Sequence, residues 1–203
     1  MIVLLNGLSR SGKDTVAKYL ERSFNFTHLK ISTPLKQAVS HMFGIPLEHL
    51  EDHRKDNLCK YGVTPRQLLK FMGTDVGQHQ IEHILPGTNR CFWINRLMLN
   101  INEHCNYVVS DYRFIHEYDA IRNKFPHTPL RVIRVVPQYP QFKQPENMDE
   151  SELTLPFDDI LYNNTIEDLY SQISQIFTPL RNTQIDVIPK SNAQLAPALA
   201  GGT

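Results

Sequence analysis

The segment that decides the fold spans residues 2–15 and reads IVLLNGLSRSGKDT. The apolar run Ile2–Leu5 predicts a buried β-strand, and the residues after Lys13 predict an amphipathic helix. Gly7 and Gly12 bracket the loop between the two elements, and Lys13 closes it. This succession is typical of the phosphate-binding P-loop, in which backbone N–H groups and a helix N-terminus surround a phosphate. The segment therefore predicts binding of a nucleoside triphosphate, with Lys13 at its β- and γ-phosphates.

The residue after the lysine departs from the usual P-loop pattern. Where a Ser or Thr hydroxyl normally contacts magnesium, this chain has Asp14, followed by Thr15. Either Thr15 takes over the metal contact, or Asp14 meets the ion directly or through water. A carboxylate beside phosphates repels them unless a cation lies between, so we expect Mg²⁺ to be obligatory. The expected ATP-binding residues of the loop are Gly7, Ser9, Arg10, Ser11, Gly12, Lys13, Asp14 and Thr15.

The composition fits one ordinary globular domain. The chain has 203 residues, of which 41% are hydrophobic and 21% charged. Its 21 basic and 21 acidic residues give a formal net charge of zero, and without a local basic stripe we expect no nucleic-acid polymer as partner. The three cysteines lack the spacing of metal ligands, and their odd number argues against a disulfide framework. The sequence shows no signal peptide and no membrane-spanning run, so we expect a cytoplasmic protein without a membrane partner.

Strand and helix signals alternate along the chain, which favours a three-layer α/β fold around a five-stranded parallel sheet. Thr64, Pro65 and Gln67 predict a capped helix start, and that helix is expected to stop near Gly73. The densely charged stretch 47–60 is expected to be helical and exposed. The expected strands are 2–6, 28–32, 107–110, 130–136 and 159–162, and further helices are expected directly after the loop and at 92–104, 117–125 and 166–177.

Two further regions carry candidate chemistry. Asp111 ends the apolar strand 107–110, where P-loop proteins position magnesium, and Arg113 follows where its guanidinium could grip a phosphate. The alternative is a strand-end aspartate that caps the next helix. Arg66 lies in the first turn of its helix, where it could bind an anion together with exposed N–H groups, or face solvent without a partner. Lys36 follows another strand-to-helix crossover and could approach the same substrate.

These residues, in this order, resemble the deoxynucleoside monophosphate kinases of tailed bacteriophages and large DNA viruses. The resemblance runs over about residues 1–177, and the ordered succession of its motifs carries it. The matching stretches are NGLSRSGKDT at 6–15, PLK at 34–36, GVTPRQLL at 62–69, MGTD at 72–75, Trp93, SDYRF at 110–114, Glu117, the acidic DESE at 149–152 and DDILYNNTIEDL at 158–169. The last stretch also resembles dephospho-coenzyme A kinases.

The resemblance implies a P-loop nucleoside-monophosphate-kinase fold that phosphorylates a deoxynucleoside monophosphate from ATP. It implies one kinase domain at 1–180, with a monophosphate-binding segment at 33–95 and a lid at 137–156, followed by a flexible tail at 181–203. The lid offers only Lys143 where the family tends to carry an arginine, and Arg134 is the expected replacement. The implied catalytic residues are Lys13, Arg113, Arg134 and Asp111; Asn163 joins the ATP site. The implied acceptor site comprises Lys36, Arg66, Gly73, Thr74, Asp75, Trp93, Arg113 and Glu152, and the metal ligands are Asp14, Thr15 and Asp111. The partners are then small molecules, in a host cytoplasm if the source is viral, and a homodimer is left open.

The sequence is also compatible with other functions. Dephospho-coenzyme A kinase and animal-type phosphomevalonate kinase share the glycine loop and similar later segments, although Thr64–Arg66 and the Ser-Asp-x-Arg stretch favour a nucleotide acceptor. A nucleotide-switch module would have no use for the acceptor-like segment 64–75. His79, Glu82 and His83 match the H-x-x-E-H pattern of zinc proteases. The alternative is a solvent-exposed helix face that happens to carry two histidines.

Overall fold

The computed structural model describes residues 1–139, 142 and 155–184. Its centre is a five-stranded, all-parallel sheet in the order β2-β3-β1-β4-β5, as predicted. The P-loop strand β1 is central and all five of its residues are buried, which explains the apolar run Ile2–Leu5 before Asn6. The strands are β1 Ile2–Asn6, β2 Phe26–Leu29, β3 Asn106–Val109, β4 Leu130–Pro137 and β5 Asp159–Asn163.

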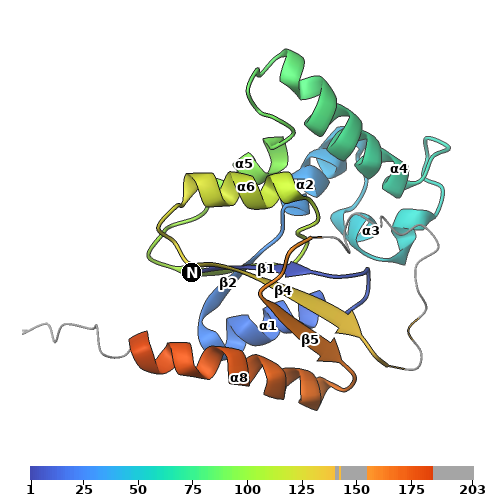
Figure 1. Cartoon of the computed structure of the whole chain (residues 1–203). Helices are drawn as coiled ribbons and strands as arrows, with labels where there is room; N and C mark the ends of the chain where they lie inside the picture. The colour runs from blue at the N-terminus through green and yellow to red at the C-terminus, as the bar shows by residue number, and fades with distance from the viewer. Residues whose placement is uncertain (140–141, 143–154, 185–203) are drawn as a thin grey trace, which may run out of the picture.

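Helices cover both faces of the sheet and complete three layers (Figure 1). Helices α1 (Lys13–Phe24) and α8 (Ile166–Gln184) pack on one face, where Leu20 and Ile173 join the strands in one core. Helices α5 (Phe92–Met98) and α6 (Ile115–Lys124) cover the other face and share a second core. Helix α8 runs to Gln184, past the last predicted apolar position and into the expected tail.

A group of short helices stands beyond the carboxyl ends of the strands (Figure 1). It has its own small core of Val39, Ile45 and Leu50. Leu50 is buried in this core, whereas the other residues of the charged stretch 47–60 are exposed or half-buried. The elements are α2 Ser32–Phe43, α3 Leu47–Glu51, the 3₁₀ turn η1 His53–Asp56, α4 Pro65–Lys70, the π-helix η2 Phe71–Gln80 and the 3₁₀ turn η3 Ile81–His83.

The start of α4 was predicted correctly and its end was not. Thr64 and Gln67 form the expected capping box. The chain does not stop near Gly73, because η2 continues to Gln80. Its glycines serve close packing instead: a Cβ on Gly77 would lie 2.2 Å from the indole nitrogen of Trp93.

Two other boundaries differ from the sequence prediction. Strand β2 ends at Leu29 rather than Ser32, because the backbone N–H groups of Ile31 and Ser32 donate to Asp111 and α2 begins there. Helix α5 ends at Met98 rather than His104, because the chain turns before it enters β3. In the part of the chain that the structure describes, no helix combines the length and apolarity needed to span a bilayer.

The core under α1 gives a test of this packing. Leu20 is fully buried, so Leu20→Ala should lower the free energy of unfolding by about 2–5 kcal/mol through lost burial and the cavity left behind. Lys18→Ala, on the exposed side of the same helix, is the matched control and should leave it within about 0.5 kcal/mol. Urea denaturation measures both, and equal loss in the two variants would contradict the predicted packing.

Candidate active site

The backbone of residues 7–12 folds as a tight loop between β1 and α1. Gly7, Arg10 and Gly12 have positive φ angles of 140°, 65° and 106°. A Cβ on Gly7 would lie 2.3 Å from the carbonyl oxygen of Val135, and one on Gly12 would lie 2.4 Å from the amide nitrogen of Asn163. Both positions therefore need glycine on two counts, the backbone angle and the space.

Side chains from the far edge of the sheet hold this loop in place. The Asn163 amide donates to the carbonyl oxygen of Ser11 at 2.9 Å, and the Tyr139 hydroxyl donates to that of Arg10. Ser11 is buried, and its hydroxyl has no hydrogen-bond partner within the described residues. Gly7, Ser11 and Asn163 thus stabilise the conformation of the loop through packing and hydrogen bonding.

Lys13 begins α1 and bends back across the loop. Its ammonium group donates to the carbonyl oxygens of Gly7 and Leu8, the latter at 2.7 Å. No side chain in the described part of the chain caps the N-terminus of α1, because its cap position is Gly12. The first-turn N–H groups and the lysine therefore gather positive potential at one place, as phosphate binding requires.

Asp14 is embedded in a polar network. Its carboxylate accepts hydrogen bonds from Lys30 Nζ at 2.9 Å and from Ser110 Oγ at 2.7 Å, and Ser110 Oγ also lies 2.8 Å from Nε2 of His28. Burial alone would raise the pKa of Asp14, but the hydrogen bonds from Lys30 and Ser110 outweigh it and lower that pKa. Asp14 is therefore ionised, with its charge matched by a lysine that the sequence analysis did not identify.

Asp111 connects β3 to the start of α2. One carboxylate oxygen accepts from the backbone N–H of Ile31 at 2.7 Å, and the other accepts from that of Ser32 at 2.9 Å. This is the helix-capping alternative, although the helix is α2 rather than the next one along the chain. A metal role for Asp111 stays a prediction, and it would have to share oxygens that already accept two hydrogen bonds.

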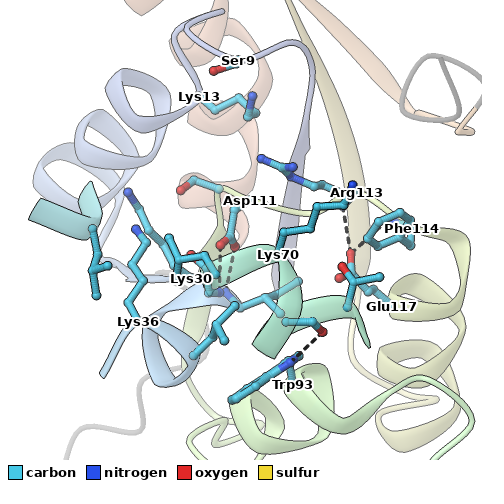
Figure 2. A pocket seen from close by; sticks show the side chains of 18 of the residues that line it. Ser9, Lys13, Lys30, Lys36, Lys70, Trp93, Asp111, Arg113, Phe114 and Glu117 are labelled. Carbon is cyan, nitrogen blue, oxygen red and sulfur yellow. Dashed lines mark hydrogen bonds between the residues drawn. The ribbon is translucent and has the colours of Figure 1, made fainter. Parts of the chain in front are cut away.

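A cavity of about 780 Å³ opens between the P-loop and the short helices. This is within the range of about 300–1,000 Å³ usual for small-molecule sites. Figure 2 shows Ser9 and Lys13 at one end and Trp93 at the other, with Asp111 and Arg113 between them. Its basic lining residues are Arg10, Lys13, Lys30, Lys36, Lys55, Arg66, Lys70, Arg90 and Arg113; its acidic ones are Asp14, Asp111 and Glu117.

Most of the predicted site residues meet in this cavity. Lining it are Ser9, Arg10, Gly12, Lys13, Asp14, Thr15, Lys36, Arg66, Gly73, Thr74, Trp93, Asp111 and Arg113. Among the described residues, the predicted positions that do not line it are Gly7, Ser11, Asp75, Arg134 and Asn163. Asp75 is exposed. Glu152 and most of the expected lid lie outside the described residues.

Three of the predicted acceptor residues have defined partners. Arg66 forms a two-pronged ion pair with Asp56, and the Lys36 ammonium lies 3.5 Å from the Glu51 carboxylate. The indole N–H of Trp93 donates to the carbonyl oxygen of Gly73 at 3.1 Å (Figure 2). The cations thus face the cavity already partly neutralised, and the tryptophan is fixed in orientation.

Arg134 does not reach this group. Its guanidinium donates to the carbonyl oxygen of Leu155 at 2.6 Å and to the side-chain oxygen of Asn6, and lies 4.3 Å from the ring centroid of Phe157. Burial lowers the pKa of Arg134. Through these contacts Arg134 holds residues 155–157 against the sheet. It does not line the cavity.

Several lining residues escaped the sequence analysis. Lys30 follows β2 and could have been found as a charge at the carboxyl end of a strand. Lys55 and Arg90 lie in polar stretches that read as surface. The buried Gln78 accepts a hydrogen bond from Arg90 at 3.1 Å.

Glu117 accepts hydrogen bonds from the backbone N–H groups of Arg113 and Phe114, and burial raises its pKa to about 7.

The zinc-protease pattern gains no support from the structure. The Glu82 carboxylate closes a local turn, accepting from Gly87 N–H at 2.7 Å, Thr88 Oγ1 at 2.6 Å and Asn89 N–H at 2.8 Å. His79 lies in η2 and His83 in η3. Within the described residues, no three potential ligands of the His, Cys, Asp and Glu types cluster as a metal site would require.

Comparison with known proteins decides the family. No family model matches the sequence. A provisionally named deoxynucleotide monophosphate kinase of Acanthamoeba polyphaga mimivirus is 30% identical over 189 residues, covering 85% of this chain and 94% of the relative. The chain belongs to the deoxynucleotide monophosphate kinase family. The resemblance inferred from the ordered motifs is thereby confirmed, and the protein is a phosphotransferase with a P-loop fold.

Solved structures give weaker matches to this kinase. Shikimate kinase of Aquifex aeolicus shares 14% identity at a TM-score of 0.46, covering 91% of this chain and 99% of its own. Thymidylate kinase of Candida albicans shares 14% identity at a TM-score of 0.39, covering 89% and 92%. At these TM-scores the matches add nothing to the assignment.

Glu117 makes the stability of the kinase depend on pH. Its folded-state pKa of about 7 lies above the ordinary 4.5, so between these values the folded protein keeps a proton that the unfolded chain releases. Rising pH across this window therefore favours unfolding.

Glu117→Gln keeps a carbonyl acceptor for the two N–H groups but carries no titrating proton. The unfolding free energy of the wild type, measured relative to this variant by urea denaturation, should fall as pH rises from 4.5 to about 7. Parallel pH profiles of the two proteins would show that the buried carboxyl does not titrate as inferred.

Proposed function

We propose that this chain transfers the γ-phosphoryl group of ATP to a deoxynucleoside monophosphate, giving ADP and the diphosphate. The observation that carries the proposal is that one cavity has the P-loop at one end and basic residues of α2, η1 and α4 in its lining. A triphosphate and a second, smaller phosphate ester can therefore face one another in one enclosure. The mimivirus relative bears the name of the same activity.

The reaction asks the protein mainly for positioning and charge. An oxygen of the acceptor phosphate attacks the γ-phosphorus, and the bond from that phosphorus to the β–γ bridging oxygen breaks. Lys13 would exchange the carbonyls of Gly7 and Leu8 for β- and γ-phosphate oxygens, with the N–H groups of Ser9–Gly12 around them. Arg113 lies between the two ends of the cavity, where charge develops on the moving group.

The residues present fit a magnesium ion of the kind that nucleotide kinases use. Thr15 and Asp14 offer a hydroxyl and a carboxylate on the cavity wall beside the loop. Mg²⁺ is usually held by one or two protein oxygens together with waters and substrate phosphates, so no larger protein cluster is needed. The ion would neutralise phosphate charge beside Asp14. Until then, Lys30 supplies a positive charge to that carboxylate.

On the acceptor side, Lys36 and Arg66 would face the phosphate, and Thr74, Gly73 and Trp93 the nucleoside. This assignment divides the domain 1–180 as the family resemblance implies, with the monophosphate segment at 33–95. The resemblance also implies a lid at 137–156 with Glu152, most of which lies outside the described residues.

An acceptor panel tests the proposal. ADP release from Mg-ATP is measured with each of the four deoxynucleoside and four ribonucleoside monophosphates, dephospho-coenzyme A and phosphomevalonate. We expect release to depend on an acceptor, with a deoxynucleoside monophosphate giving the highest kcat/KM. Fastest turnover with dephospho-coenzyme A or phosphomevalonate would move the chain to those activities, and release that ignores every acceptor would indicate a switch.

Lys13→Ala tests the P-loop end of the cavity. Removing the ammonium group deletes a charge-assisted donor to the phosphates, so turnover should fall at least about 10²–10³-fold, towards the limit of detection. Urea denaturation should show an intact fold. Lys18→Ala, on the exposed side of the same helix, should keep wild-type turnover, and full activity in the Lys13 variant would refute the catalytic role.

A further inference from the structure

Lys55 is a basic residue of the cavity wall to which the site described above gives no role. Lys55 lies on η1 and lines the cavity. Its side chain is half-buried, and its ammonium group has no hydrogen bond or ion pair with any part of the chain that the structure describes. A lysine that loses water without gaining a partner costs free energy, unless a ligand supplies the partner.

The neighbours of Lys55 show why its charge is unbalanced. Burial lowers its pKa, and the positive charge of Arg66 lowers it further; the negative charge of Asp56 opposes this shift, and Lys36 and Arg10 lower the pKa by smaller amounts. The adjacent Asp56 carboxylate is turned to the Arg66 guanidinium, to which it accepts two hydrogen bonds. Lys55 therefore stands among cations whose nearby carboxylates are already engaged.

The turn that carries Lys55 is held rigidly enough to aim it. The Asp52 side chain accepts from the backbone N–H of Arg54 at 2.7 Å and pairs with the Arg54 guanidinium. The backbone N–H of Lys55 donates to the carbonyl oxygen of Asp52. The side chain thus projects from a hydrogen-bonded 3₁₀ turn and lines the cavity together with Arg66 and the P-loop residue Arg10.

We infer that Lys55 binds the phosphate of the acceptor nucleotide, between Lys36 and Arg66. The inference rests on the proposed function, which it deepens by naming a phosphate ligand. A guanidinium has more N–H donors than the two that Arg66 spends on Asp56, so Arg66 can hold Asp56 and still donate into the cavity. A terminal phosphate monoester carries close to two negative charges at neutral pH and can accept from all three cations.

Binding calorimetry on the full chain tests the role of Lys55. Ligands are a deoxynucleoside monophosphate that the wild type phosphorylates, the matching nucleoside without phosphate, and Mg-ATP. Lys55→Met should bind the monophosphate about 10- to 100-fold more weakly, as expected for loss of one hydrogen bond between charged groups. Its affinities for the nucleoside and for Mg-ATP should match those of the wild type.

Two further variants control for charge and folding. Lys60→Met removes an exposed lysine on the same segment that lies over the Tyr61 ring and outside this cavity, so it should leave all three affinities unchanged. Lys55→Arg keeps the positive charge and should retain most of the monophosphate affinity. Urea denaturation of Lys55→Met should match that of Lys60→Met.

The outcomes separate the inference from the proposed function. If the wild type phosphorylates a monophosphate and Lys55→Met binds that monophosphate as tightly as the wild type does, the inference is overturned and the proposed function stands. The inference also fails if nucleoside affinity falls by the same factor, or if only Mg-ATP affinity falls, which would place Lys55 on the donor side. Wild type that neither binds nor phosphorylates any monophosphate overturns the proposed function itself.

Discussion

The close contact between the P-loop and the far edge of the sheet is the constraint on which the rest depends. Gly7 lies against the backbone of Val135, and Gly12 against the amide of Asn163, which also holds the carbonyl of Ser11. Residues of β4 and β5 thus contact the loop that follows β1 and restrict its conformation. Because the loop leaves no room for a Cβ at these two points, it lies close against both strands, and Gly12 and Lys13 at the start of α1 line the cavity. The position of Lys13, and of the cavity itself, follows from that geometry.

A second theme is the pairing of positive with negative charge around the cavity. Lys30 pairs with Asp14, Lys36 with Glu51, and Arg66 with Asp56. These pairs are partly exposed and each adds little stability. Their larger effect is to let many basic side chains gather at one place in a protein of zero formal net charge without strong mutual repulsion.

The sequence predicted those elements that depend on a local pattern of residues, namely the strands and the phosphate-binding loop. Apolar runs such as Ile2–Leu5 placed all five strands, and the glycine spacing placed the loop. Contacts between distant segments were beyond it: η2 continues past Gly73 because Gly77 packs under Trp93, and Asp111 caps α2 although α2 lies about 80 residues earlier. Lys55 reads in sequence as one charge among many, and only the fold turns it into the cavity. The sequence also could not show that Arg134 contacts Leu155 and Phe157 instead of lining the cavity, so its catalytic role stays a prediction.

The tethered carboxylates have a consequence for which anions can enter. Glu51 and Asp56 are covalently part of the chain, so they compete with any incoming ligand at high effective concentration. A singly charged group offers Lys36 or Arg66 little more than the carboxylate already does. A terminal phosphate, with nearly twice the charge and three free oxygens, offers more. The site should therefore ignore chloride and the internal diester links of nucleic acids, and accept only the ends of nucleotides.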